Sequence, residues 1–135
     1  MITRDPLVVI TLPVRDLERS RSFVESVGWS VDQGLSGDGA LCAVISPHIR
    51  AMFVTDASFR AVTGRAVADP AVAGETVTCL VVESRFHVDH VVERALAAGA
   101  AEAGEPEDHG ASYLRTFVDP DGHLWQVRWT ADDAA

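Results

Sequence analysis

Val9-Ile10-Thr11-Leu12-Pro13-Val14-Arg15-Asp16 and Val77-Thr78-Cys79-Leu80-Val81-Val82-Glu83-Ser84 decide the fold, because they follow one pattern in the two halves of this 135-residue chain. Each is a run of apolar, strand-forming residues that ends on a residue suited to cap a helix. Each precedes an amphipathic stretch that a glycine closes, Leu17 to Val27 before Gly28 and Phe86 to Ala98 before Gly99. A repeated strand–helix unit predicts two copies of one module.

Strand candidates after each predicted helix complete two modules of the same order. In the first half they cover residues 29–35, 40–45 and 50–55, and in the second half they lie near Ala101 and over residues 112–118 and 124–129. Turn-forming residues, among them Asp119-Pro120-Asp121-Gly122, separate the last two strands. Each half therefore follows a β-α-β-β-β order. A short helix over residues 56–64 and a loop over residues 69–74 connect the halves.

Both faces of the predicted strands are largely apolar, which indicates that both faces of the sheet are covered. Helices on one face and a shared cleft on the other meet this condition. We therefore expect an α+β fold in which two βαβββ modules form a curled mixed sheet around a cleft, with the helices outside. Residues 1–68 would form the first module with its connecting helix and residues 69–135 the second, together making one domain.

The composition indicates a folded, acidic protein. Hydrophobic residues make up 47% of the chain, enough to bury an interior, and the formal net charge is −9. This charge argues against nucleic acid and anionic membranes as partners, since both require clustered cations. Cys42 and Cys79 lie in apolar runs and are predicted to be buried free thiols. Because we find no signal-peptide pattern and no run long enough to span a bilayer, we expect a cytoplasmic protein.

Two further stretches carry a resemblance to a known family. They are Leu12-Pro13-Val14-Arg15-Asp16-Leu17-Glu18-Arg19-Ser20, followed by Phe23 and Gly28-Trp29, and Phe117-Val118-Asp119-Pro120-Asp121-Gly122-His123-Leu124-Trp125. The first resembles the opening, and the second the closing hairpin, of the vicinal-oxygen-chelate superfamily, which includes glyoxalase I, extradiol dioxygenases, fosfomycin-resistance transferases and bleomycin-binding proteins. The chain is most similar to the branch of small glyoxalase-like proteins named predicted lactoylglutathione lyases. The resemblance implies paired βαβββ modules, a homodimer and a ligand in the cleft.

The resemblance also implies where metal-dependent members hold their ion, on the first and last strands of each module. The corresponding first-strand residues are Val9 and Val77, and the closing strand of the second half offers Gln126. Alignment of the two proline turns makes Phe53 the counterpart of Gln126, or Met52 if the register slips by one residue. Valine and phenylalanine offer no lone pair to a divalent metal, and a single glutamine gives too few ligands. We therefore expect no metal or other cofactor at this position.

Strand alternation indicates which other side chains face the cleft. In the first strand, Leu12 and its same-face neighbours would lie under the helix, which leaves Thr11 toward the cleft. In the strand over residues 112–118, the apolar alternates would meet the helix, which leaves Tyr113 and Arg115 toward the cleft. The expected ligand-binding set is Thr11, Phe53, Tyr113, Arg115, Gln126 and Arg128. An equally supported alternative places Tyr113 and Arg115 at the rim, with Arg115 paired to a carboxylate.

The remaining polar and aromatic residues give weaker signals. His48, His109 and His123 lie in or beside turns, where they satisfy backbone groups or face solvent, and a displaced metal site is the alternative. His87 and His90 form a lone His-x-x-His pair at the start of the second helix. The alternation that points Gln126 into the cleft places its neighbours Trp125 and Trp129 on the helix side.

These patterns leave three functions open. The first, which we favour, is metal-independent binding of a small organic molecule by a homodimer, similar to sequestration by bleomycin-binding proteins. The second is a divalent-metal-dependent glyoxalase-like lyase or isomerase, or a dioxygenase, and the third is a protein that acts through its dimer surface. The charge of the ligand stays undecided, because the acidic balance tolerates a cation whereas Arg115 and Arg128 favour an anion. The sequence also leaves open whether the modules pair within one chain or swap between chains.

Overall fold

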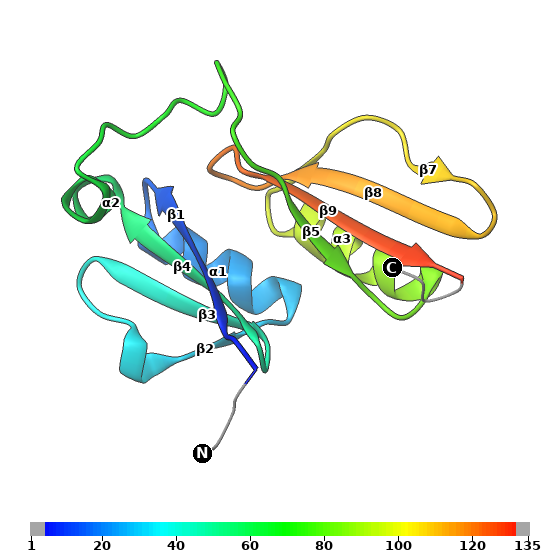
Figure 1. Ribbon diagram of the computed structural model, residues 1–135, viewed down its shortest axis with the longest axis horizontal. Coiled ribbons are helices and arrows are strands. Elements are labelled where there is room, and N and C mark those ends of the chain that lie inside the picture. Colours follow the sequence, from blue (N-terminus) through cyan, green and yellow to red (C-terminus); the bar gives the residue numbers. More distant parts are fainter. Residues whose placement is uncertain (1–4, 132–135) are drawn as a thin grey trace. The chain divides into compact units, whose positions relative to one another are not determined.

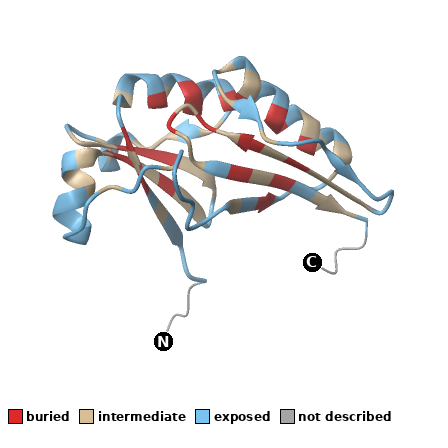
Figure 2. Ribbon diagram, turned by 90° about the horizontal axis from the view of Figure 1, so that it is seen from above, coloured by how far each residue is buried: buried red, intermediate tan, exposed pale blue. Residues whose placement is uncertain are grey.

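The computed structural model describes residues 5–131, and its contacts divide the chain into two compact units, Met1–Ala68 and Asp69–Ala135. Each unit contains its own mixed β-sheet, with α1 and α2 in the first unit and α3 in the second (Figure 1). Buried residues lie along the helices and strands, and the connecting segments are largely exposed (Figure 2). The elements confirm the predicted α+β class. No helix within residues 5–131 is long and apolar enough to cross a membrane.

The first unit follows the predicted order with one addition. Its elements are β1 (Val8–Val14), α1 (Leu17–Val27), β2 (Ser30–Val31), the 3-10 helix η1 (Gln33–Leu35), β3 (Ala40–Ser46), β4 (Ile49–Thr55) and α2 (Asp56–Thr63). The sheet order is β1-β4-β3-β2, with β1 parallel to β4 and the other pairs antiparallel. The strand expected over residues 29–35 is shorter, because the Asp32 carboxylate accepts hydrogen bonds from the amides of Gly34 and Leu35 and starts η1 there.

Helix α1 forms where the sequence supplies both ends. The Asp16 carboxylate accepts hydrogen bonds from the amides of Glu18 and Arg19 at 3.0 and 3.2 Å, which satisfies donors of the first turn. Gly28 ends the helix in the left-handed conformation, at φ 102°. The buried side of α1, which includes Phe23, Val24 and Val27, covers the sheet face that carries Leu12.

The second unit has the elements β5 (Thr78–Val81), α3 (Arg85–Ala97), β6 (Ala101–Glu102), β7 (Glu107–Asp108), β8 (Ser112–Val118) and β9 (Leu124–Thr130). The sheet order is β5-β9-β8-β6, and β7 also pairs with β8. Strands β5 and β9 are parallel, and the other pairs are antiparallel. The two-residue strand β7 lies between the strands predicted near Ala101 and over residues 112–118, in a segment for which the sequence predicts no strand.

Helix α3 packs on one face of the second sheet. Ser84 caps it, since its Oγ accepts a hydrogen bond from the His87 amide at 3.0 Å. The buried residues of α3 are Val88, Val91, Val92 and Ala95. On the sheet, Trp125 and Val127 are fully buried, whereas Gln126 between them is half-buried and Arg128 is exposed. The alternation predicted for Trp125 and Gln126 is therefore present.

Candidate functional site

Each sheet has one face opposite its helix, and in the second unit this face carries the Gln126 position. Cys79, Gln126 and Thr116 lie directly opposite one another on β5, β9 and β8. Val81, Arg128 and Leu114 form the next row in the same way. Directly opposed residues in a sheet point to the same side, so these six side chains share one face. We call these six residues the Gln126 face.

The opposite face of the second sheet holds Tyr113 and Arg115, which corrects the prediction that both line the cleft. The Tyr113 hydroxyl donates to Asp89 Oδ1 of α3 at 2.7 Å, and Arg115 Nη1 donates to the same oxygen at 2.8 Å. Arg115 also pairs with Glu93 of α3 at 2.9 Å and with Glu102 of β6 at 2.8 Å. The alternative prediction, in which Arg115 pairs with a carboxylate, is closer to the structure. It placed the pair at the rim of the cleft, however, whereas the pair lies under α3.

The charge balance around Arg115 explains why a polar side chain occupies the helix side. Only 7% of Arg115 is exposed, and a buried cation is tolerated when carboxylates pair with it. The hydrogen bond from Arg115 lowers the pKa of Glu102 below its usual range. Burial, followed by the hydrogen bond to Asp89, raises the pKa of Tyr113. The cluster therefore joins α3 to β6 and β8 as fixed charges and contributes nothing to the Gln126 face.

A second cation on the helix side extends this arrangement. Arg85 Nη1 donates to Asp108 Oδ1 at 2.9 Å, and the Arg85 guanidinium lies 4.5 Å from the centre of the Tyr113 ring and 5.9 Å from that of Trp129. Hydrogen bonds from Arg85, and then from the Gly110 amide, lower the pKa of Asp108 to about 2. Trp129 therefore faces the helix side, as its alternation with Gln126 predicts.

The closing turn is held by Asp119, which is buried. Asp119 Oδ1 accepts hydrogen bonds from the amides of Asp121 and His123 at 2.9 and 3.0 Å, and Oδ2 accepts one from Trp125 Nε1 at 3.1 Å. Desolvation raises the pKa of Asp119, and the charge of His123 and these hydrogen bonds oppose that rise. Turn chemistry accounts for this aspartate, as its place in the Asp119-Pro120-Asp121-Gly122 turn predicts.

Phe53 is on the other face from the one predicted. It lies opposite Leu12 of β1 and Leu41 of β3 and is buried on the side of α1, while Met52 lies opposite Thr11 and Cys42. The expectation of Phe53 as a cleft residue is therefore wrong. The one-residue slip to Met52 gives the position that shares a face with Thr11.

The cause is a difference in turn length. Two residues separate β3 from β4, whereas five residues, 119–123, separate β8 from β9. An alignment of the two proline turns therefore assigns the side chains of β4 to the wrong faces of the sheet.

The residues at the family's metal positions do not fit a divalent ion. With the corrected register they are Val9 and Met52 in the first unit and Val77 and Gln126 in the second, so the first pair offers one thioether sulfur and the second pair one amide oxygen. Such ions in proteins take imidazole nitrogens, carboxylate oxygens or thiolates, normally at least three in a catalytic zinc site. Within residues 5–131 no group of three or more histidines, cysteines, aspartates and glutamates is placed to hold a metal ion.

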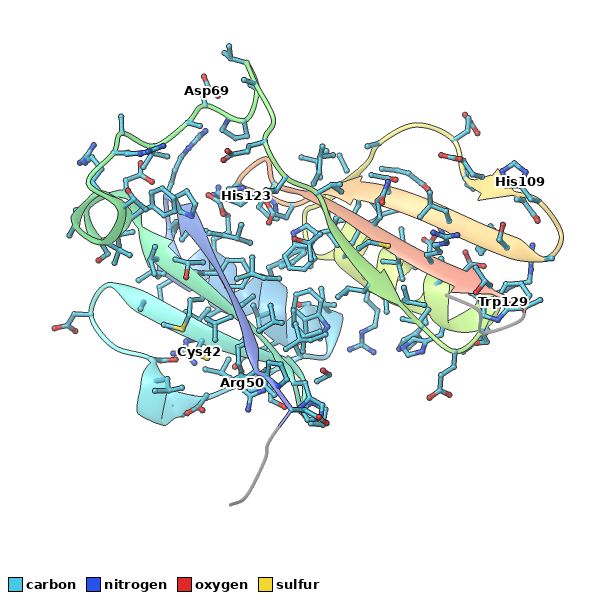
Figure 3. The ribbon with its side chains drawn as sticks, in the orientation of Figure 1. Cys42, Arg50, Asp69, His109, His123 and Trp129 are labelled. Carbon is cyan, nitrogen blue, oxygen red and sulfur yellow. The ribbon has the colours of Figure 1, made fainter. Side chains whose placement is uncertain are left out.

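Within the second unit, the two turn histidines do not come together. His109 and His123 lie at opposite ends of the second sheet (Figure 3). The backbone amide of His109 donates to Ser112, and that of His123 donates to Asp119, so both positions serve their turns. In the first unit, the amide of His48 donates to Ser46 Oγ at 3.3 Å.

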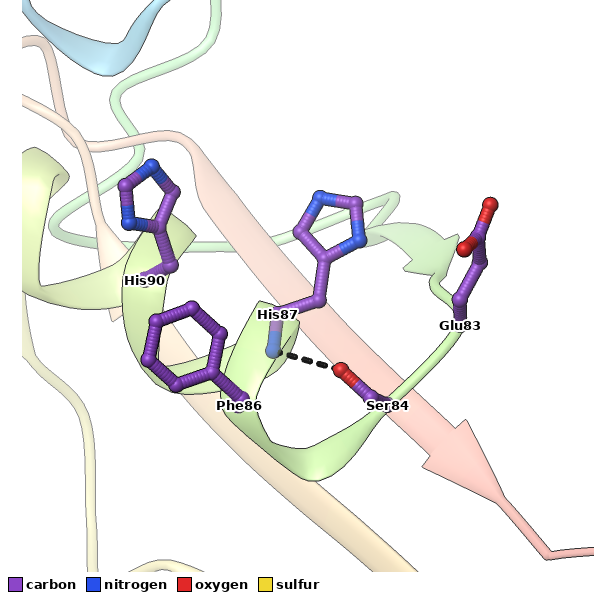
Figure 4. A pocket seen from close by; sticks show the side chains of 5 residues that line it. All are labelled: Glu83, Ser84, Phe86, His87 and His90. Atoms are coloured by element: carbon purple, nitrogen blue, oxygen red, sulfur yellow. Dashed lines mark hydrogen bonds between the residues drawn. The ribbon is translucent and has the colours of Figure 1, made fainter.

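One pocket went unnoticed in the sequence. It is an open hollow of about 340 Å³ at the start of α3, lined by Glu83, Ser84, Phe86, His87 and His90. The imidazoles of His87 and His90 lie on one side of the helix (Figure 4), and the rings of Phe86 and His90 stack with centres 6.1 Å apart. The His-x-x-His spacing was the only signal for it, because the exposure of Phe86, 77%, cannot be read from periodicity.

The prediction of buried cysteines is half correct. Cys42 is fully buried, but Cys79 is exposed on the Gln126 face. Burial raises the pKa of Cys42, and desolvation raises the pKa of Cys79 while Arg128 lowers it by less. Both side chains therefore stay as neutral thiols near pH 7, and neither supplies a thiolate nucleophile.

The fold and these strand positions can be compared with known proteins. A model of the Glyoxalase/Bleomycin resistance protein/Dioxygenase superfamily matches residues 7–127. The chain belongs to this superfamily. Its membership confirms the resemblance carried by the opening and closing stretches. A search of the curated proteins found no match.

Solved structures share the fold at low sequence identity. The hypothetical protein SA1046 from S. aureus is 24% identical, with a TM-score of 0.77 over 96% of this chain and 95% of that one. A glyoxalase-related enzyme from Fulvimarina pelagi is 22% identical, with a TM-score of 0.78 over 94% and 89%. The fosfomycin resistance protein FosX from Listeria monocytogenes is 20% identical, with a TM-score of 0.65 over 100% and 97%. These likenesses show the fold, and function has to be argued from the side chains.

Proposed function

We propose that this member of the superfamily binds a small organic molecule without a metal ion at the family position, and acts by sequestration. The observation that carries the proposal is the donor set itself. Val9, Met52 and Val77 stand where coordinating groups would be needed, and Gln126 alone offers an oxygen. Neither the thioether of Met52 in the first unit nor the amide oxygen of Gln126 in the second supplies the charge or the nitrogen ligands that make metal sites stable.

The Gln126 face has the composition of a small-molecule surface. Val81 and Leu114 supply apolar contact area, and Gln126 and Thr116 supply an amide and a hydroxyl between them. A few polar groups on an apolar surface fix the orientation of a ligand and give it specificity. Thr11 and Met52 provide a comparable pair on the corresponding face of the first unit.

The side chains of this face also favour binding over catalysis. The thiol of Cys79 is kept protonated, and no carboxylate lies beside it on β5, β8 or β9 to act as a general base. The alternative is a divalent-metal-dependent lyase, isomerase or dioxygenase, and one protein of the same fold is described as a glyoxalase-related enzyme. We further propose a homodimer, which the molar mass in solution would test.

The proposal is tested by two measurements on untagged protein. Elemental analysis after expression with added Zn, Ni, Mn and Fe should find no stoichiometric metal. A thermal-shift screen of the same preparation should find compounds that raise Tm in the presence of a chelator, because a ligand that binds the native state stabilises it.

A matched pair of variants locates the binding. Gln126→Leu should weaken the binding of the compounds found in the screen. Gln33→Leu, the same change at an exposed residue of η1, should not. One metal ion per chain, together with hits that require it, would overturn the proposal in favour of the enzyme. Compounds that bind equally well to the Gln126→Leu variant would show that the ligand binds to another surface.

A further inference from the structure

We propose that the ligand of the Gln126 face is an organic anion, a carboxylate or phosphonate with an apolar body, and that Arg128 recognises it. This inference rests on the proposed function and adds the chemical class of the ligand. The sequence left the charge of the ligand open, because the acidic composition tolerates a cation whereas two arginines predicted in the cleft favour an anion. The proposal decides between these two signals.

The structure first removes Arg115 from the question. Its guanidinium is paired with Asp89, Glu93 and Glu102 on the helix side. Arg85, a second cation of that side, is paired with Asp108. Neither arginine has charge left to offer a ligand on the opposite face.

Arg128 is arranged differently. It lies on β9 two residues beyond Gln126, so the two side chains leave the same face about 7 Å apart. Its side chain is exposed, and within residues 5–131 its guanidinium makes no hydrogen bond or ion pair. By contrast Arg50, on the corresponding face of the first unit, donates to the carbonyls of Ser46 and Pro47 (its position is shown in Figure 3).

Arg128 is the one charged residue among the six of the Gln126 face, in a protein of net charge −9. The residues of β5, β8 and β9 on this face include no carboxylate. Among the paired strand residues of this face the acidic one is Glu107 of β7, and Leu114 stands between it and Arg128 in the row across the sheet. Glu83, two residues after Val81, lines the hollow at the start of α3. An anion on this face would therefore meet one guanidinium and no carboxylate from β5, β8 or β9.

The chemistry of the row suits such a ligand. A guanidinium binds a carboxylate or phosphonate through two parallel hydrogen bonds, which is the strongest neutralisation a single side chain offers. The Gln126 amide can donate a further hydrogen bond, and Val81 and Leu114 on either side of Arg128 can contact an apolar body. A cationic ligand would instead place like charge beside Arg128.

The test uses the full chain and a library of compounds in matched sets. Each carboxylate or phosphonate is paired with its primary amide and with the corresponding amine, at constant ionic strength and pH 7.5. Binding is measured by calorimetry, and the Nε–Hε signal of Arg128 is followed in ¹⁵N–¹H spectra.

We expect the hits to be anions, and we expect them to shift the Arg128 signal. Arg128→Gln should lower the affinity for each anion about tenfold or more, because a charged pair of hydrogen bonds is lost. Arg128→Lys should keep part of the affinity, because it keeps the charge without the fork. The control Arg65→Gln, an exposed arginine after α2, should change nothing. Circular dichroism of each variant checks that it is folded.

Two outcomes overturn the inference alone: amides or amines that bind as well as their acids, or anions whose affinity survives Arg128→Gln. A library in which no compound of any charge binds would overturn the proposed function as well. The two failures are therefore distinguishable in one experiment.

Discussion

The Arg115 guanidinium donates to the Asp89 carboxylate across 2.8 Å and so joins the middle of β8 to α3. The same oxygen of Asp89 accepts from the Tyr113 hydroxyl, which makes one carboxylate the meeting point of two β8 side chains. This arrangement holds the helix on its sheet and leaves the other face of β8 to Leu114 and Thr116. The position of the candidate site thus depends on a cluster that takes no part in it.

Replacement of Arg115 should therefore destabilise the protein without a specific effect on binding. Arg115→Met removes ion pairs to three carboxylates that are themselves partly exposed, so we expect a loss of about 2–3 kcal/mol in the free energy of unfolding. Urea denaturation measures it, with Arg65→Met as the control. A folded variant that kept full stability but lost its ligand would place Arg115 in the site and contradict this account.

The Arg85–Asp108 pair should make stability depend on pH in the acid range. The folded-state pKa of Asp108 is lowered from 3.8 to about 2, so the pair stabilises the fold above pH 4 and the contribution disappears as pH falls toward 2. The difference in stability between the wild type and Asp108→Asn should be constant from pH 6 to pH 4.5 and shrink below. A difference that grows on acidification would have the wrong sign.

The closing turn should be sensitive to the loss of the Asp119 carboxylate. Asp119→Ala leaves two backbone amides and the Trp125 indole without their acceptor in a buried place, which should cost about 2–4 kcal/mol. Asp119→Asn should cost less, because its amide oxygen can still accept from the backbone. Unfolding followed by tryptophan fluorescence gives both values, and equal effects of the two changes would argue against the hydrogen bonds as the cause.

Gly122 should tolerate no side chain. Its φ is +93°, and a Cβ there would lie 2.7 Å from Pro70 Cγ, so strain and overlap both act against alanine. We expect Gly122→Ala to lower stability by about 1–3 kcal/mol. Gly74→Ala is the matched control, since a Cβ at Gly74 meets nothing within 4 Å and its φ is not in the left-handed region. Similar Tm values for the two variants would refute the argument.

The sequence predicted the helices and the main strands because their signals are local. Asp16 and Ser84 cap α1 and α3 as expected, and the repeat of the two halves appears in the elements of the two units. The facing of individual strand residues was less predictable. For Tyr113 and Arg115, the rule that apolar residues meet the helix failed because the carboxylates that neutralise Arg115 come from elements distant in sequence.

Phe53 shows the second kind of error. The face of the sheet on which it lies depends on the number of residues in the preceding turn. One missing or additional residue moves every side chain of the strand to the opposite face. Gln126 and Arg128 lie on the helix-free face of β9, as the alternation of that strand predicts, because the closing motif fixes its register directly. Their part in ligand binding stays a prediction. Cys79 was expected to be buried, and it is exposed because β5 is an edge strand whose helix-free face bears it.

The central claim, a binding face with no metal at the family position, is tested most directly by metal titration watched at Gln126. Chelator-treated protein is titrated with Zn²⁺, Ni²⁺, Mn²⁺ and Fe²⁺ under nitrogen, and the side-chain amide signals of Gln126 are followed by NMR. We predict that none of these ions shifts or broadens them at stoichiometric concentration. A saturable change at Gln126 with one ion per chain would contradict the claim.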